Sequence, residues 1–112
     1  MKITKEQWVA EGKKMFGDNM FLWKFKCPGC GHVQTPEDFR PFKEAGATPN
    51  SAYSECIGRY TGGKSWANDK QSKPGPCDYA GYGLFKISPV IVVDGANETH
   101  AFAFSPNEEA KR

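Results

Sequence analysis

The residues of this chain best suited to chemistry are two cysteines, Cys27 and Cys30, which two residues separate. This spacing lets both sulfur atoms turn toward a single point, as in one half of a zinc site. Gly29 and Gly31 allow the backbone to fold tightly beneath that point and to aim N–H groups at the sulfur atoms. The string therefore predicts a metal-binding knuckle.

The chain contains four cysteines in all, and Zn2+ prefers four tetrahedral ligands. A second Cys-x-x-Cys pair would complete a standard zinc ribbon, whereas here two single cysteines stand in its place. A site with four thiolate ligands has no open position for water, so we expect a structural zinc ion. The predicted Zn2+ ligands are Cys27, Cys30, Cys56 and Cys77.

Two alternatives to the four-cysteine site stay open on the sequence alone. His32 or His100 could replace one of the single cysteines as a zinc ligand. Cys56 could instead be a small buried hydrophobic side chain in a protein without a metal. The spacing of the cysteines favours the four-thiolate site over both.

The length of the chain makes a metal useful to the fold. It has 112 residues, of which 38% are hydrophobic and 13% aromatic. A chain this short has a small hydrophobic core, so a metal that links distant segments adds much stability. We expect one zinc-binding domain over residues 1–105 and a flexible C-terminal tail over residues 106–112.

The sequence contains no signal for a membrane or for export. The N-terminal residues lack an apolar signal core, and the longest apolar run, residues 89–93, is too short to span a bilayer. We therefore expect a cytoplasmic protein. In that reducing compartment, four cysteines are metal ligands more often than disulfides.

Short elements must position the cysteines, and their pattern predicts an α+β fold. Thr4 and Gln7 have the spacing of a capping box, two Thr-Pro pairs are typical of helix starts, and Asp94-Gly95 is typical of a hairpin turn. The predicted helices cover residues 5–16, 35–45 and 48–60, and the predicted strands cover 20–26, 32–34, 83–87, 89–94 and 99–105.

The expected architecture is a small zinc-stabilised single domain, with a zinc-ribbon-like knuckle, short helices and an antiparallel sheet. In the helix over residues 48–60, Cys56 would share an inward face with Tyr53, Ile57 and Tyr60.

Trp23 and Phe25 alternate with lysines in the predicted strand over residues 20–26, so we expect both aromatic side chains in the core. Stacking of Trp23 on nucleic acid is the alternative.

Residues 58–65 match the P-loop pattern letter for letter, but their surroundings do not fit it. A P-loop follows a buried strand and opens a helix, whereas residues 52–57 are predicted to be helical and prolines soon follow the string. The histidines have no evident partner serine, and no carboxylates are spaced for acid–base catalysis. We therefore expect a protein that is not an enzyme.

The predicted partner-contact loop over residues 59–82 combines glycines, four cations and four aromatic side chains, Tyr60, Trp66, Tyr79 and Tyr82. Cations contact phosphates, and exposed aromatic side chains stack on bases or anchor protein interfaces. An ordinary solvated loop can have the same composition. The candidate partner-binding residues are Arg59, Tyr60, Lys64, Trp66, Lys70 and Lys73. The small net charge of +2 favours a protein partner, whereas the known use of zinc knuckles favours nucleic acid.

Three strings resemble an uncharacterised family of small bacteriophage and prophage proteins: CPGCGHVQTP at residues 27–36, ECIGRYTG at 55–62 and GLF at 83–85. The resemblance implies an accessory protein in the cytoplasm of a bacterial host. Its partner would be a host protein that it redirects or inhibits, or alternatively phage DNA or RNA. The resemblance implies no mechanism, and the sequence predicts no oligomeric state.

Overall fold

The computed structural model describes residues 2–62, 76–81 and 87–105. Four of the predicted partner-binding residues lie outside these ranges: Lys64, Trp66, Lys70 and Lys73. The predicted tail and nearly all of the predicted strand over residues 83–87 also lie outside them. In the described part of the chain, no helix has both the length and the apolar character needed to cross a bilayer.

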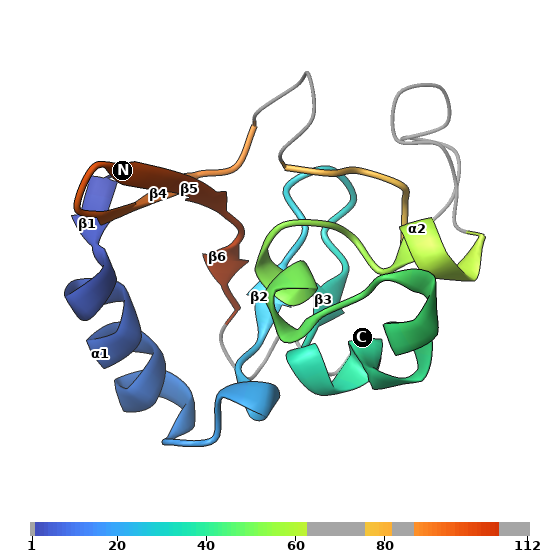
Figure 1. Ribbon diagram of the computed structural model, residues 1–112, viewed down its shortest axis with the longest axis horizontal. Helices are drawn as coiled ribbons and strands as arrows, with labels where there is room; N and C mark the ends of the chain where they lie inside the picture. The colour runs from blue at the N-terminus through green and yellow to red at the C-terminus, as the bar shows by residue number, and fades with distance from the viewer. Residues whose placement is uncertain (1, 63–75, 82–86, 106–112) are drawn as a thin grey trace.

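One end of the molecule is a three-stranded mixed sheet with a helix against it (Figure 1). The strand β1 (Lys2–Thr4) pairs in parallel with β4 (Val90–Asp94), and β4 pairs antiparallel with β5 (Asn97–Ala101). Gly95, in the turn between β4 and β5, has a φ of 63°, a conformation that favours glycine. This turn confirms the predicted hairpin.

The helix α1 (Lys5–Phe16) begins where the sequence predicts. The Thr4 side chain accepts a hydrogen bond from the Gln7 N–H, and the Gln7 side chain accepts one from the Thr4 N–H, which completes the capping box. Gly12 faces the Trp23 ring, and a Cβ atom at Gly12 would overlap that ring. The glycine therefore lets α1 approach the core closely.

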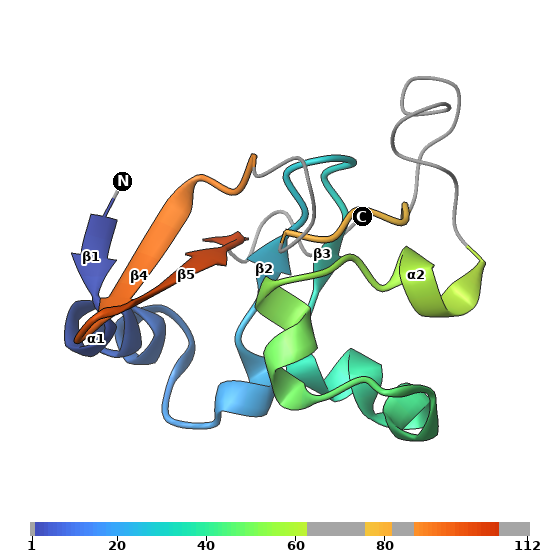
Figure 2. The same ribbon diagram turned by 45° about the horizontal axis from the view of Figure 1, so that its top comes forward.

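A second, antiparallel sheet lies in the middle of the molecule. Its strand order is β3 (Val33–Gln34), β2 (Phe25–Lys26) and β6 (Ala103–Phe104). The loop between β2 and β3 contains the predicted knuckle, so this small sheet delivers the first two cysteines. Figure 2 shows the sheet between the hairpin side of the molecule and the side with the short helices.

Four short helices complete the part of the fold that the structure describes: η1 (Met20–Leu22), η2 (Pro36–Ala45), η3 (Pro49–Tyr53) and α2 (Gly58–Thr61). The predicted helix over residues 35–45 corresponds to η2, which is a 3-10 helix with a non-helical residue, Phe42, directly after Pro41. Together with the two sheets, these helices confirm the predicted α+β class.

The core on the hairpin side is aromatic and centres on Trp8. This ring stacks on Phe25 and Phe104, and it meets Trp23 and Tyr53 edge to face, with centroid distances of 5.2–6.1 Å. Trp23 is only 1% exposed, and its indole N–H donates to a backbone carbonyl. The structure therefore places Trp23 in the core, where it cannot stack on nucleic acid.

The prediction of a strand over residues 20–26 is wrong in its first half. The Asn19 side chain accepts a hydrogen bond from the Phe21 N–H (3.1 Å), and this cap starts η1 instead of a strand. The predicted strand over residues 99–105 is divided at Phe102, whose N–H donates to the Tyr53 carbonyl (2.8 Å) instead of to a neighbouring strand. The strand β1 was not predicted.

The prediction of one helix over residues 48–60 is also wrong. The structure has η3, then a break, then α2. Within the break, Glu55 forms an antiparallel bridge with Ala80, and the Cys56 N–H donates to the Tyr79 carbonyl (2.9 Å). These contacts with a segment distant in sequence replace the hydrogen bonds that a helix would make here.

Candidate metal centre

The four cysteines come from three separate segments of the chain and meet at one point. Cys27 and Cys30 lie in the loop between β2 and β3, Cys56 lies between η3 and α2, and Cys77 lies in the segment over residues 76–81. Their Sγ atoms all lie within 4.8 Å of one another. The structure thus brings together the complete predicted ligand set.

The distances between the sulfur atoms fit a tetrahedral metal site. The Sγ atoms of Cys27 and Cys77 are 3.8 Å apart, and those of Cys30 and Cys56 are 3.7 Å apart. Four sulfur atoms at about 2.3 Å from a central Zn2+ form a tetrahedron with edges of about 3.8 Å. A disulfide would require about 2.05 Å. The four thiols are free, and both of these pairs have the separation that a shared ion requires.

Neither histidine takes part in this cluster. Among the described residues, the group of side chains placed to hold a metal consists of the four cysteines alone. His100 lies on β5, opposite Ile91 of β4, and His32 contributes its backbone carbonyl to the knuckle, where it accepts from the Cys27 N–H (2.9 Å). The alternative of a histidine ligand therefore has no support in the geometry.

Backbone hydrogen bonds shape the first knuckle. The Gly31 N–H donates to the Cys27 carbonyl (2.8 Å), and the Gly29 N–H points at the Cys27 sulfur (3.4 Å). Gly31 has a φ of 82°, a left-handed conformation that glycine adopts without strain. Gly29 thus aims its N–H at a sulfur atom as the sequence predicts, and Gly31 provides the predicted tight turn of the backbone.

Contacts between two separate backbone segments position the other two ligands, Cys56 and Cys77. The Cys77 N–H donates to the Cys56 sulfur (3.3 Å), and the Tyr79 N–H donates to the Cys77 sulfur (3.4 Å). Gly58 packs directly against the backbone of Cys77. Two single cysteines therefore replace a second Cys-x-x-Cys pair because their backbones run side by side.

The site is almost closed to solvent. Cys27, Cys56 and Cys77 are at most 1% exposed, whereas Cys30 is only partly buried. Burial of neutral thiols costs little, but burial of thiolates requires compensating positive charge. Only the Cys30 side of the cluster lies near the surface.

Contacts among the thiols shift their pKa values in opposite directions. Hydrogen bonding with Cys30 raises the pKa of Cys27 well above its ordinary value, whereas hydrogen bonding with Cys27 lowers the pKa of Cys30. The N–H groups of the knuckle also favour negative charge on sulfur. Four thiolates at these distances repel one another, and a divalent cation at their centre is the charge that allows all four to ionise.

A buried glutamine, which the sequence analysis did not identify, holds the segment that carries Cys56. The Gln34 side-chain N–H2 donates to the carbonyls of Ala52 (2.8 Å) and Glu55 (2.7 Å), and its oxygen accepts from the Ile57 N–H (3.0 Å). Gln34 is 0% exposed. It fastens the break between η3 and α2 to β3, next to the knuckle.

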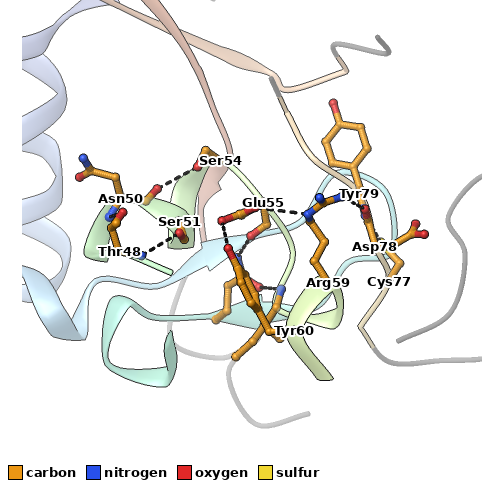
Figure 3. Close-up of polar contacts among 12 residues, drawn as sticks. Thr48, Asn50, Ser51, Ser54, Glu55, Arg59, Tyr60, Cys77, Asp78 and Tyr79 are labelled. Atoms are coloured by element: carbon orange, nitrogen blue, oxygen red, sulfur yellow. Dashed lines mark hydrogen bonds and ion pairs between the residues drawn. The ribbon is translucent and has the colours of Figure 1, made fainter. Parts of the chain in front are cut away.

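Arg59 connects the segments that carry the last two ligands (Figure 3). Its Nε atom lies 3.3 Å from a carboxylate oxygen of Glu55, and its Nη1 atom donates to the Asp78 carbonyl (3.1 Å). The Tyr60 hydroxyl donates to the other oxygen of Glu55. Glu55 is 5% exposed, so both contacts compensate a buried carboxylate.

The two described members of the predicted partner-binding set thus have intramolecular contacts. Arg59 is exposed and Tyr60 half-buried, and the Tyr60 ring packs against Phe39 and Phe42 of η2. A role for either residue in partner binding stays a prediction. No sequence signal marks Gln34, because its partners are backbone groups distant in the sequence. The signal that could have found Glu55 is its i,i+4 spacing to Arg59.

The chain matches no curated protein and no solved structure. The VVA0879-like family matches residues 4–105, a range that contains all four cysteines, Gln34 and Arg59. The chain therefore belongs to the VVA0879-like family.

Proposed function

We propose that the chain binds one structural Zn2+ ion and serves as a non-enzymatic binding module for a partner protein. The observation that carries the zinc assignment is the pair of Sγ–Sγ distances, 3.8 and 3.7 Å, which match the edges of a tetrahedral zinc–thiolate site. Tetrahedral sets of four sulfur ligands suit zinc or iron. The proposed ligands are Cys27, Cys30, Cys56 and Cys77.

Our proposal of a structural zinc ion rests on the number of ligands. Four cysteine ligands fill the tetrahedron and leave no position at which water or a substrate binds the metal. The ion would link the loop between β2 and β3 to the two segments that carry Cys56 and Cys77, both distant from this loop in the sequence. Its binding free energy would then contribute directly to folding.

For the partner, we propose a bacterial host protein that the chain redirects or inhibits, in the bacterial cytoplasm. The resemblance of its sequence strings to small phage and prophage proteins supports this choice. The net charge of +2 supports it too, because a nucleic-acid-binding surface needs several uncompensated cations. Binding of DNA or RNA is the alternative.

The zinc proposal is tested by elemental analysis of the purified full chain. We expect one equivalent of zinc and no iron, and we expect that Cys56→Ser removes the zinc and unfolds the chain. His32→Ala is the control, and it should keep a full equivalent. Zinc far below one equivalent in native protein, or a full equivalent in Cys56→Ser, would contradict the four-cysteine assignment.

The binding proposal is tested separately by affinity capture from bacterial lysate, with and without nuclease. Specific capture of a host protein that survives nuclease supports a protein partner. Capture that nuclease abolishes supports the nucleic-acid alternative instead. Chain that has lost its metal to a chelator serves as the control, because its surface would no longer be organised.

A further inference from the structure

An apolar groove lies between η1, η2 and the start of η3, and part of its lining belongs to the aromatic core around Trp8. It consists of two adjoining hollows of about 620 and 240 Å3 that share Phe21, Pro36 and Pro49. The larger hollow alone is within the range of ligand-binding pockets, about 300–1,000 Å3. Because they share these residues, the two hollows form one apolar surface across η1, η2 and η3, large enough to contact a segment of polypeptide.

Exposed apolar side chains border the groove. Met20 lines the smaller hollow and is 47% exposed, and its neighbour Leu22 is 51% exposed. These are two of the three large hydrophobic side chains that the described residues expose, and both belong to η1. Neighbouring exposed apolar side chains beside a groove are a feature of interaction surfaces.

The charges that line the groove are all positive. Arg40 and Lys43 of η2 line the larger hollow, and no acidic side chain lines either hollow among the described residues. The Arg40 guanidinium covers the ring of Phe21 at 4.4 Å and pairs with Glu37 at 2.6 Å. Lys43 forms no ion pair with the described residues, so its charge is available to a ligand.

The floor of the groove is connected to the metal centre. Phe39, which lines the larger hollow, is 1% exposed, and its ring contacts Tyr60 on its other side. Tyr60 in turn is hydrogen-bonded to Glu55, the residue before Cys56. The metal-binding segments thus support the helix that forms one wall of the groove.

We propose that this groove docks an acidic, amphipathic peptide segment of a partner protein, a statement that rests on the protein-binding function proposed above. Apolar side chains of the segment fill the hollows, and its carboxylates face Lys43 and Arg40. Nucleic acid fits less well. Among the residues that the structure describes, only two cations line the groove, and one of them is already paired with Glu37.

Selection from a library of short random peptides on the zinc-loaded full chain tests the docking site. We expect the selected peptides to combine glutamate or aspartate with leucine, phenylalanine or tryptophan. Titration of one selected peptide then gives its affinity for the chain and for two groove variants. Met20→Ala and Lys43→Glu should each weaken binding by about fivefold or more.

Matched controls lie elsewhere on the surface. Ile87, 42% exposed and outside the groove, is the control for Met20, and Lys13, in the last turn of α1 as Lys43 is in that of η2, is the control for Lys43. Ile87→Ala and Lys13→Glu should change the affinity less than twofold. A peptide with its acids replaced by lysines should bind Lys43→Glu better than it binds the unaltered chain.

Several outcomes would overturn the groove assignment. The assignment fails if the library yields no binding peptide, or if the selected peptides are basic. It also fails if the selected peptides bind both groove variants as tightly as they bind the unaltered chain. Competition by an oligothymidine for the groove would assign this face to nucleic acid. A dimer that Met20→Ala dissociates would assign it to a second copy of the chain. In each case, nuclease-resistant capture of a host protein shows separately whether the protein-binding function stands.

Discussion

Gly58 and Cys77 pack backbone against backbone, so that the space where a Cβ atom of Gly58 would lie is occupied by the main chain of Cys77. The contact brings the start of α2 against a metal ligand that is distant in sequence. It explains how a single cysteine is held at the site without a second knuckle. Main-chain atoms cannot move aside as a flexible side chain can.

Replacement of Gly58 by alanine should therefore displace Cys77. We expect Gly58→Ala to lower the free energy of unfolding by about 3 kcal/mol or more and to weaken metal binding. Chemical denaturation and elemental analysis measure the two effects. Gly62→Ala is the control, because Gly62 has a φ of 75° but no atom of the described residues near its Cβ position, and strain alone costs about 1–2 kcal/mol. Equal losses in both variants would contradict the contact.

Replacement of the buried Gln34 should also lower the stability of the fold strongly. Gln34→Leu keeps much of the side-chain volume but leaves the carbonyls of Ala52 and Glu55 and the N–H of Ile57 without their buried partner. At about 1–3 kcal/mol for each buried unsatisfied group, the free energy of unfolding should fall by about 3 kcal/mol or more.

The control for Gln34 is the same replacement at an exposed glutamine. Gln7→Leu removes only the capping-box acceptor of α1 and should cost about 1 kcal/mol or less. Thermal and chemical denaturation of the two variants give the comparison. If Gln34→Leu is no less stable than Gln7→Leu, the side chain does not fasten the metal-binding segment.

The parts of the fold that the sequence predicts correctly are those that neighbouring residues determine. The capping box at Thr4 and the Thr-Pro start of η2 are read from residues within one helical turn. The knuckle is also local, since Cys27 and Cys30 need only two intervening residues and the glycines around them. The four-cysteine cluster followed from a count of ligands, because the chain holds no further cysteine.

The parts that the sequence does not predict depend on partners far along the chain. Residues 48–60 have helical periodicity, but Gln34 and Tyr79 satisfy the backbone around Cys56 and break the helix there. The strand β1 has only three residues, and it exists because β4 offers a parallel edge. Tertiary contacts of this kind override local preference, and one sequence contains no record of them.

We expect the Tyr60 hydroxyl to make the fold less stable at high pH. Burial raises the pKa of Tyr60, and its hydrogen bond to Glu55 and the charge of Glu55 raise it further. Unfolded tyrosine titrates near pH 10, so above about pH 10 the unfolded chain releases a proton that the folded chain keeps. The protonated Tyr60 hydroxyl therefore makes its full contribution to stability below about pH 10. The free energy of unfolding falls as the pH rises beyond this value.

Tyr60→Phe tests this dependence. The variant should be less stable than the unaltered chain at neutral pH, because Glu55 loses a hydrogen-bond donor. Its free energy of unfolding should then fall less steeply above about pH 10. Urea denaturation across that pH range gives both slopes. Parallel slopes for the two proteins would show that Tyr60 does not titrate differently in the folded state.

Arg59 should control how readily the metal leaves. Its guanidinium joins Glu55, which precedes one ligand, to the backbone of Asp78, which follows another. Groups that orient metal ligands typically change metal affinity by about 10–100-fold when they are removed. We expect Arg59→Ala to bind one equivalent of metal and to release it to a chelator about tenfold faster. Arg59→Lys keeps the charge but not the two-sided contact, and it should recover only part of the difference.

Arg40→Ala is the matched control for Arg59, because Arg40 also pairs with a nearby glutamate, Glu37, but touches no metal-binding segment among the described residues. Its metal release should match that of the unaltered chain. Transfer of the metal to a chromophoric chelator, followed at constant pH, gives the rates of metal release for the unaltered chain and the three variants. If Arg59→Ala and Arg40→Ala release metal equally fast, the bridge to Asp78 does not hold the site closed. The role of Arg59 would then be limited to compensating the buried carboxylate of Glu55.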